Sequence, residues 1–390
     1  MHDKFILIKF PIFVIAFLLL LYGCAENRSS DIDSDLIPIR WEDLEERDMF
    51  CTDGKLDSCR FVILETSDNC LLGATAKVEI TDKYIVILSN KKIFVFDTEG
   101  KFLNTIGRIG PGPNEHLTIS DFYLDEEAGT IGVYDVWRAE ITRYSMDGKM
   151  INKTKCDPVL KEACDILGLN EGLLLISMHN NLKNDYHYIL VNENDNKLSG
   201  NYIPYISRGR ANLNIPKYYY ATDKTYHYVL AMFSDTIYHF TNREITSKYV
   251  LQTPIKKPTK TDIDKYGTFE TGMDVMTFLR RDGFSLGIIN IYAAGGYIFF
   301  AYGMKGDFYQ VFWNIAENKG YYNLYQEIEN PLCRINQIST TTREAFVSVL
   351  DAYTVVESLK TVPDRSLFKE LEKVDYQDNP ILVFYYIVKK

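Results

Sequence analysis

An aromatic side chain beside a guanidinium group offers the most distinctive chemistry in this sequence. Trp137 and Arg138 are adjacent, and Asp135 stands two residues before the tryptophan. A flat indole face can stack on a sugar ring, and a guanidinium fork can hold a carboxylate with two hydrogen bonds. This cluster therefore predicts a binding site for a glycan or a peptide carboxylate. A capping tryptophan with solvated charges beside it is the simpler alternative.

A glycine-rich segment adds two further candidate binding residues, Arg108 and Asn114. The segment reads GRIGPGPNEH from Gly107 to His116. It is not a Walker phosphate loop, and because it connects two expected strands, no helix N-terminus follows it to complete an anion site. We interpret it as a tight link between two repeats that leaves Arg108 and Asn114 exposed.

The titratable residues form no recognisable catalytic or metal-binding pattern. An acidic stretch contains Asp121, Asp125, Glu126 and Glu127, but it lacks the DxDxDG order of a calcium loop. The histidines are scattered without an HExxH motif, and no GxSxG or CxxC sequence occurs. We therefore expect no catalytic residue, no metal and no cofactor.

The start of the chain predicts export and lipid attachment at Cys24. Lys4 and Lys9 precede an apolar run from Phe10 to Tyr22, which is shorter than the roughly 20 residues that a membrane-spanning helix needs. The run leads into Leu21-Tyr22-Gly23-Cys24, which resembles a bacterial lipobox, with tyrosine where a small residue is usual. Residues 1–23 are then a lipoprotein signal peptide, and acyl chains on Cys24 anchor the protein to a membrane. Ordinary cleavage, with Cys24 incidental, is the alternative.

Residues 24–58 are expected to form a tether between the acylated cysteine and a folded domain. They are polar and acidic, with few apolar side chains that could form a core. Ala25 is not an acidic residue that would retain a lipoprotein at the inner membrane, so we expect an outer-membrane location, facing the periplasm or the cell surface. The net charge of −10 argues against nucleic acid as a partner.

The cysteines other than Cys24 permit disulfides without selecting them. An even number in an exported chain allows pairing, but six cysteines have 15 connectivities. Cys51 with Cys59 and Cys156 with Cys164 are the nearest pairs in the sequence, and Cys70 and Cys333 remain. Buried free thiols are an equally open interpretation.

The elements that must position these side chains are short apolar strands in a repeated unit. Each copy has an apolar strand, a polar turn, a second strand, a turn with lysine and a third strand, as from Tyr84 to Gly107 and from Thr130 to Lys155. The turns Gly100-Lys101, Gly148-Lys149 and Asn196-Lys197 recur at an interval of 48 residues (148 − 100 and 196 − 148). This interval is close to the roughly 40 to 50 residues of one propeller blade. Further copies begin at Leu173, His227 and Tyr297.

These copies, together with the two ends of the chain, predict an all-β, six-bladed β-propeller over residues 59–390. The sixth blade needs a strand from each end, Cys59 to Ser67 and Asn379 to Lys390, whose pairing closes the ring and removes open edges. Two insertions interrupt the repeat, Pro254 to Phe284 and Thr341 to Val374. The second predicts a small amphipathic helix that follows Asp364 as its N-cap and carries Leu367, Phe368, Leu371 and Val374.

One segment carries a family resemblance. IGRIGPGPNEHLTISDFYLDEEAGTIGVYD, from Ile106 to Asp135, resembles the link and blade start of six-bladed β-propeller lipoproteins of Bacteroidota and, more distantly, NHL repeats. The resemblance covers nearly the whole mature chain, from about Arg60 to the closing NPILVFYYIVKK, although His116 stands where an aromatic residue such as tyrosine is expected. It implies a fold and an envelope location far more than an activity.

A propeller brings the links between blades, and the turns between second and third strands, to one face. On that face we expect the candidate ligand-binding residues Arg108, Asn114, Asp135, Trp137 and Arg138. Together these features predict a cell-envelope lipoprotein whose propeller is a binding or scaffolding module for a glycan, a peptide or a partner protein. The alternative is a propeller enzyme, a lyase or hydrolase acting on a polysaccharide or peptide, because one fold can host many activities.

Overall fold

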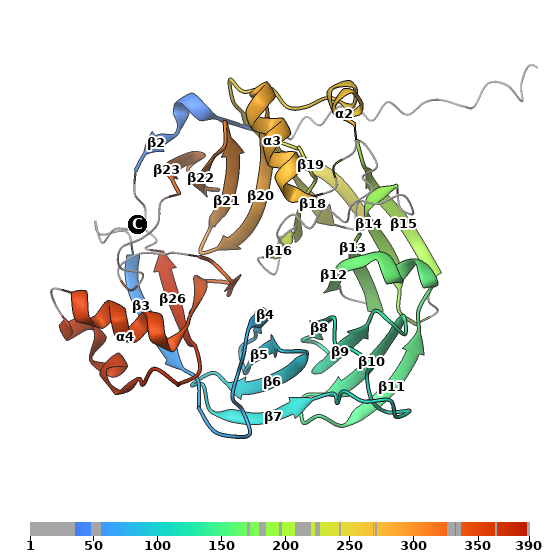
Figure 1. The fold of residues 1–390 in the computed structure, drawn as a ribbon, viewed down its shortest axis with the longest axis vertical. Coiled ribbons are helices and arrows are strands. Elements are labelled where there is room, and N and C mark those ends of the chain that lie inside the picture. Colours follow the sequence, from blue (N-terminus) through green and yellow to red (C-terminus); the bar gives the residue numbers. More distant parts are fainter. Residues whose placement is uncertain are drawn as a thin grey trace, which may run out of the picture. The chain divides into compact units, whose positions relative to one another are not determined.

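Six small β-sheets follow one another around a ring in the computed structural model (Figure 1). The chain divides into two units, Met1–Leu36 and Ile37–Lys390, and the second unit forms the ring. The structure describes residues 36–47, 56–169, 172–178, 185–194, 197–206, 220–222, 227–241, 243–267, 269, 271–325, 332, 337–362 and 365–387. The predicted six-bladed β-propeller is confirmed.

The first three blades are four-stranded antiparallel sheets that follow the sequence in order from the inner to the outer strand. Blade 1 comprises β4 (Thr75–Ile80), β5 (Tyr84–Ser89), β6 (Lys92–Asp97) and β7 (Phe102–Ile106). Blade 2 comprises β8 (Asp121–Asp125), β9 (Thr130–Asp135), β10 (Glu140–Ser145) and β11 (Met150–Lys155). Blade 3 comprises β12 (Ala163–Gly168), β13 (Leu173–Met178), β14 (Tyr186–Asn192) and β15 (Lys197–Pro204).

The last three blades borrow strands from the N-terminal part of the chain. Blade 4 comprises β16 (Tyr220–Thr222), β17 (His227–Leu230), β18 (Thr236–Thr241), β19 (Glu244–Gln252) and β1 (Ile37–Arg40). Blade 5 comprises β20 (Ser285–Ala294), β21 (Tyr297–Met304), β22 (Asp307–Asn314), β23 (Lys319–Leu324) and β2 (Glu45–Glu46). Blade 6 comprises β24 (Thr340–Thr341), β25 (Ala345–Leu350), β26 (Ile381–Ile387) and β3 (Leu56–Ile63).

The strands form where the sequence is continuously apolar. Ile85 and Val86 of β5 and Ile93 of β6 are fully buried, because neighbouring blades cover both faces of each sheet. Between β6 and β7 the chain turns at Gly100, whose φ of 87° lies in the left-handed region. A Cβ atom there would lie 2.5 Å from the carbonyl oxygen of Ile63 in blade 6. Both the turn and the neighbouring blade therefore require glycine.

β26 and β3 close the ring, as predicted from the two ends of the chain. They pair antiparallel, with Ile381 opposite Ile63. Asn379, just before β26, fixes the junction to blade 1, since its side-chain amide donates to the carbonyl oxygens of Glu65 (2.6 Å) and Cys70 (2.7 Å). The ring is therefore closed by a strand pair and by buried hydrogen bonds from Asn379.

Residues 37–46, which we call the strap, attach to the outside of the ring. This differs from the free tether expected for residues 24–58. β1 pairs in parallel with β19, and β2 pairs in parallel with β23. Ile39 and Leu44 are buried. The strap pairs with the outermost backbone edges of blades 4 and 5, which would otherwise be left open. The remaining residues of the expected tether, apart from Leu36, Arg47 and residues 56–58, lie outside the described chain.

Both predicted insertions carry helices. The first holds α2 (Lys260–Tyr266) and α3 (Gly272–Asp282), each of which begins with a capping box. The second holds α4 (Ala352–Thr361) and the 3₁₀ helix η4 (Arg365–Lys373). Its predicted start at Thr341 was wrong, because β25 of blade 6 lies within the predicted range. Short 3₁₀ turns also occur at η1 (Trp41–Asp43) and η2 (Pro158–Glu162). In the part of the chain that the structure describes, no helix is long and apolar enough to cross a membrane.

η4 is the amphipathic helix predicted in the second insertion. Phe368, Leu371 and Val374 are buried against blade 6, as their spacing indicated. Asp364, its expected N-cap, lies outside the described residues. α4 was not predicted, because its apolar residues lie within a segment that we interpreted only as an interruption of the repeat.

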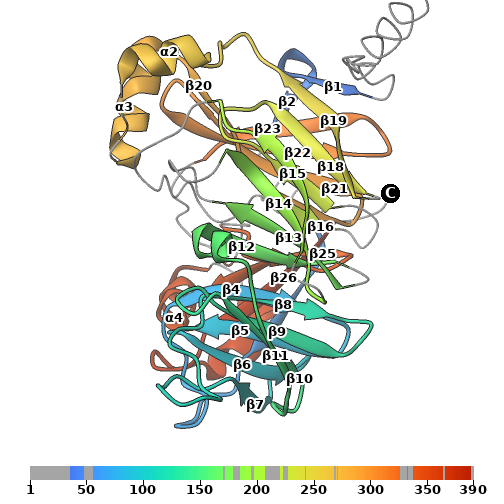
Figure 2. The ribbon, with the colours of Figure 1, turned by 90° about the vertical axis from the view of Figure 1, so that its right-hand side faces the viewer.

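The antiparallel order of each blade gives the ring two faces. The link face carries the turns between second and third strands and the links between blades, in residues 64–74, 90–91, 107–120, 136–139, 156–162, 185, 205–206, 231–235, 253–284, 305–306, 325, 332, 337–339 and 351–380 where described. The hairpin face carries the other turns, in residues 81–83, 98–101, 126–129, 146–149, 169, 172, 193–194, 243, 295–296, 315–318 and 342–344 where described. Figure 2 shows α2, α3 and α4 on the same side of the ring, which is the link face.

Cys156 and Cys164 are separate free thiols, so the disulfide considered between them is not formed. Burial raises the pKa of both thiols to about 12, which makes them unreactive at neutral pH. Cys70 is buried and donates to the carbonyl oxygen of Glu65 at 3.1 Å. The three cysteines at positions 24, 51 and 333 lie outside the described residues.

Candidate functional site

Asp135 is a fully buried carboxylate that organises the loops around it. Its Oδ1 accepts the backbone N–H groups of Trp137 (3.0 Å) and Arg138 (3.1 Å) in the turn between β9 and β10. Its Oδ2 accepts the N–H of Leu117 at 2.7 Å, in the link that precedes blade 2. Because the protein itself uses both oxygens, Asp135 holds two loops together and offers no acceptor to a ligand.

Arg138 also holds the link before blade 2 in place through hydrogen bonds. Its Nη2 donates to the carbonyl oxygens of Pro111 and Gly112, both at 3.4 Å. Glu115 fixes the same loop by accepting the N–H of Gly112 at 2.9 Å. The glycine-rich segment is therefore a link that is fastened to the blade by side chains, as the sequence indicated.

Trp137, Arg108 and Asn114 remain exposed on the link face. Trp137 is 64% exposed, and Lys91 Nζ lies 5.7 Å from the centroid of its ring, within the range of a cation–π contact. Arg108 pairs with Glu115, with 3.3 Å between Nε and Oε1, and most of its side chain stays in solvent. Of the five candidate binding residues, these three present their side chains to solvent and the other two are structural.

Two of the acidic residues considered for calcium, Asp121 and Asp125, belong to separate ion pairs. Asp121 Oδ1 lies 3.1 Å from Lys77 Nζ, which joins the inner strands of blades 1 and 2. Asp125 Oδ2 lies 3.2 Å from Arg143 Nη1. Burial in the ring raises the pKa of Glu79, whose carboxylate lies 3.6 Å from the same lysine. Among the described residues, no group of three His, Cys, Asp or Glu side chains is placed to hold a metal ion.

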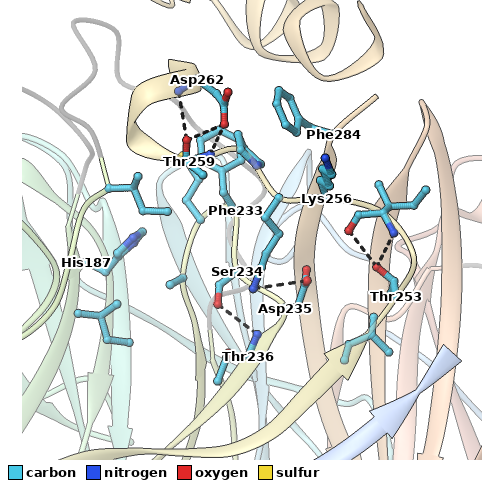
Figure 3. Close-up of a pocket in the computed structure, with 18 of the residues that line it drawn as sticks. His187, Phe233, Ser234, Asp235, Thr236, Thr253, Lys256, Thr259, Asp262 and Phe284 are labelled. Carbon is cyan, nitrogen blue, oxygen red and sulfur yellow. Dashed lines mark hydrogen bonds and ion pairs between the residues drawn. The ribbon is translucent and has the colours of Figure 1, made fainter. Parts of the chain in front are cut away.

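A cleft of about 1350 Å³ opens on the link face at blade 4 (Figure 3). Its floor is the turn 231–235 between β17 and β18. The first insertion forms one wall, with Phe284 and Asp262, and blade 3 forms another, with His187. We call this site the blade-4 cleft. It lies where the first insertion leaves blade 4.

The insertion can form a wall because it shares a hydrophobic core with blades 4 and 5. Phe269, Val275 and Phe278 are buried and pack together with Met232 and Phe233 from the turn below. Phe233 has a φ of 57°, a left-handed conformation that costs about 1–2 kcal/mol for a residue other than glycine. Packing of its ring against the insertion offsets this strain and holds the floor of the cleft in place.

Asp235 lies in the floor of the cleft with only one satisfied oxygen. The residue is 5% exposed, and its Oδ2 lies 3.5 Å from Lys257 Nζ. Its Oδ1 is buried and accepts no hydrogen bond from the described residues. Burial raises the pKa of this carboxyl, while Lys257 and then the Tyr302 hydroxyl act in the opposite direction. A buried acceptor without a donor costs about 1–3 kcal/mol, and such a group in a cleft marks a candidate functional site.

Lys256 is an exposed lining cation that forms no ion pair with the described chain. The other charged groups around it have partners. Asp262 accepts the N–H of Thr259 at 2.9 Å in the capping box of α2. Asp282 lies 2.7 Å from Arg281. Lys256 is therefore the charge at this cleft that is left for a ligand.

The rest of the lining is aromatic or bears hydroxyl groups. Burial lowers the pKa of His187 to about 3, so its imidazole is neutral at physiological pH. Phe284 is half-buried at the wall. The Thr253 hydroxyl lies 3.1 Å from the hydroxyl of Tyr302. A few fixed polar groups among aromatic surfaces are typical of a site for a polar organic ligand.

Asp235, Lys256 and Lys257 were not among the candidate residues from the sequence. Two weak signals pointed to them. Ser234-Asp235 falls in a turn expected on the link face, and the insertion Pro254 to Phe284 interrupts the repeat. The sequence could not show that the two segments meet in one cleft.

Exposed large apolar side chains gather on the link face. They are Leu71, Ile109, Leu117, Trp137, Ile206, Met273, Tyr325, Tyr353 and Tyr376. The others in the described chain lie on the outermost strands β7, β11 and β15, and are Leu103, Met150, Ile151 and Leu198. The described turns of the hairpin face carry none. A concentration of apolar surface on one face is a mark of an interaction site.

Comparisons with known proteins concern the family and the fold. The profile of a family described as "Domain of unknown function (DUF4934)" matches residues 38–386. The structure of a Bacteroides fragilis protein, provisionally described as exported, is similar with a TM-score of 0.73 and 18% identity, over 90% of this chain and 100% of that one. A DUF4221 family member from Bacteroides vulgatus is similar with a TM-score of 0.53 and 11% identity, over 85% of this chain and 97% of that one. No curated protein sequence matches the chain.

Proposed function

The chain belongs to the DUF4934 family, and we propose that it is an exported lipoprotein whose propeller binds a partner through the link face. Lipid on Cys24 would attach it to the cell envelope, most simply at the outer membrane. The provisional description of the Bacteroides fragilis protein as exported supports this location. The partner is a glycan, a peptide or a protein of the envelope.

The observation that carries the proposal is the unequal distribution of exposed apolar side chains between the two faces. Trp137, Tyr353 and Tyr376 lie on the link face, and the last two pack with 5.7 Å between their ring centroids. Tryptophan and tyrosine are enriched at the energetic centres of interfaces, because each buries a large surface and keeps a polar group. The same face carries the blade-4 cleft and the helical insertions.

Site-specific photocrosslinking in the native cell envelope tests the use of the link face. A crosslinking side chain at Trp137 or Tyr353 is expected to form adducts with a recurring partner, because these positions are exposed on the proposed surface. Asp82 and Glu317, exposed on the hairpin face, are the matched controls and should give far fewer adducts. Equal yields from both faces, or adducts from the hairpin face alone, would overturn the proposal.

Fractionation of a Cys24→Ala variant tests the anchor separately. The substitution removes the thiol that accepts the lipid, so the protein should lose its fatty-acid label and leave the membrane fraction. The wild-type chain, labelled in parallel, is the control. Retention of the label by the variant would refute lipid attachment at this residue.

A further inference from the structure

We propose that the blade-4 cleft binds an acidic oligosaccharide, with a sugar carboxylate on Lys256 and ring hydroxyls on Asp235. The inference rests on the proposed function, since it places one ligand on the link face. It concerns the cleft alone, however, and can fail while partner binding elsewhere on that face survives.

The buried acceptor of Asp235 favours a ligand that donates a hydrogen bond. Asp235 lines the cleft, and its buried Oδ1 has no donor among the described residues, while Lys257 already stands 3.5 Å from Oδ2 (Figure 3). Because that lysine offsets the charge of the carboxylate, a second cation is not needed at Oδ1. A neutral hydroxyl group supplies the missing hydrogen bond without adding charge, and a hydrogen bond to an ionised acceptor is stronger than one between neutral groups.

The unpaired ammonium of Lys256 favours an anionic ligand. Asp282 is paired with Arg281, and Asp262 accepts hydrogen bonds from Thr259 in the capping box of α2, so neither carboxylate forms an ion pair with Lys256. A ligand that carries one negative group together with several hydroxyl donors satisfies both lysine and aspartate. A uronic acid combines a carboxylate and vicinal hydroxyls on one ring.

The size and lining of the cleft favour several sugar units. Its volume of about 1350 Å³ exceeds the roughly 300–1,000 Å³ of pockets for drug-sized ligands. Phe284 presents a half-buried aromatic ring at the wall, on which a sugar face can stack. Thr259 and Thr261 border the same space and add hydroxyl groups.

A peptide ligand fits this site less well. Extended peptides gain most of their affinity by adding a strand to an open sheet edge. The outer edge of β19, which lies beside the cleft, is already covered by β1, with Ile39 opposite Leu251. A peptide could not add a strand to that edge of blade 4.

Calorimetric titration of the full-length protein in detergent tests the proposal. The probes are trimers of galacturonic, glucuronic and mannuronic acid, the methyl ester of the galacturonic acid trimer, and trialanine. At least one free-acid trimer should bind, its affinity should exceed that of the ester, and trialanine should not bind. Binding of trialanine but no trimer, or no binding of any uronic acid trimer, overturns the proposal.

Three variants assign the binding to the proposed residues. Lys256→Ala should weaken binding of the acid by about tenfold or more and leave binding of the ester unchanged, because it removes one charge-assisted contact. Asp235→Asn should weaken both ligands, since it weakens the acceptor for hydroxyl groups. Lys260→Ala, on α2 but outside the cleft lining, is the matched control and should change neither. If Lys256→Ala affects both ligands equally, or affects neither, the assignment of the carboxylate is wrong.

The photocrosslinking experiment separates this inference from the proposed function. If no uronic acid trimer binds while Trp137 and Tyr353 still form specific adducts, the acidic-sugar assignment fails and the link face keeps its role. If no uronic acid trimer binds and Trp137 and Tyr353 also form no specific adducts, both proposals fail.

Discussion

The hairpin face and the link face are built from the same repeat, yet they satisfy their polar groups in different ways. On the hairpin face the turn between β6 and β7 satisfies its own polar groups. Asp97 Oδ1 accepts the N–H groups of Glu99 (3.0 Å) and Lys101 (2.9 Å), and Gly100 supplies the positive φ. On the link face Asp235 is left with an unpartnered buried oxygen and Phe233 holds a strained backbone. The turn at Gly100 satisfies its own polar groups, whereas the turn at Asp235 bears costs that the fold does not require.

This difference indicates where selection for function acts. Local strain and unsatisfied polar groups persist only where surrounding structure supports them, and they cluster at binding sites. The first insertion provides such support through the core that it shares with blades 4 and 5, in which Phe278 and Leu279 are buried. The turns of the hairpin face have no comparable addition, so they need only connect the strands. Substitutions on the two faces should therefore differ in what they damage.

The largest effect is expected at a turn of the hairpin face. Gly100→Ala forces a side chain into the left-handed region and places its Cβ 2.5 Å from the Ile63 carbonyl oxygen. We expect a loss of about 3 kcal/mol in the free energy of unfolding, from conformational strain together with the clash. Gly129→Ala has a positive φ but open space around the new Cβ, and should lose only about 1 kcal/mol. Urea unfolding of both variants measures the difference, and equal losses would show that contact with blade 6 is unimportant.

A smaller effect of opposite sign is expected in the blade-4 cleft. Burial raises the pKa of Asp235 above its ordinary value of 3.8, so the folded protein holds this proton more tightly than the unfolded chain does. The contribution of Asp235 to stability is therefore fully present below the unfolded pKa and is lost as pH rises through the folded pKa. At neutral pH, Asp235→Asn should leave the free energy of unfolding unchanged or slightly higher, while it weakens ligand binding.

The pH dependence distinguishes this outcome from a structural role. The stability of Asp235→Asn relative to wild type should increase as pH rises from about 4 to neutral, because only the wild-type protein carries the cost of the buried charge. Trp137→Ala, also on the link face, is the control and should show no such trend. Unfolding by urea at a series of pH values measures both. A clear loss of stability at neutral pH in Asp235→Asn would mean that its pair with Lys257 holds the fold.

The blades and their closure were predictable because their signals are local. Continuous apolar runs such as Ile85–Leu88 and turns such as Gly100-Lys101 recur at a constant interval, so each blade can be recognised alone. The closing strand 381–387 was recognised in the same way, from an apolar run at the end of the chain. The strap was missed because Ile39 and Leu44 are isolated among polar residues. Its partners are also distant in the sequence, since Ile39 lies opposite Leu251 (251 − 39 = 212) and Glu45 lies opposite Tyr321 (321 − 45 = 276).

The roles of the site residues depended on contacts that spacing does not encode. Asp135, Trp137 and Arg138 are neighbours in the chain and looked like one binding cluster. The turn directs the carboxylate of Asp135 to backbone N–H groups and leaves the tryptophan in solvent. Asp235 and Lys257 meet only because the first insertion folds back over blade 4. Residue types are written in the sequence, but the direction of a side chain and the partner it finds are set by packing between segments that are distant along the chain.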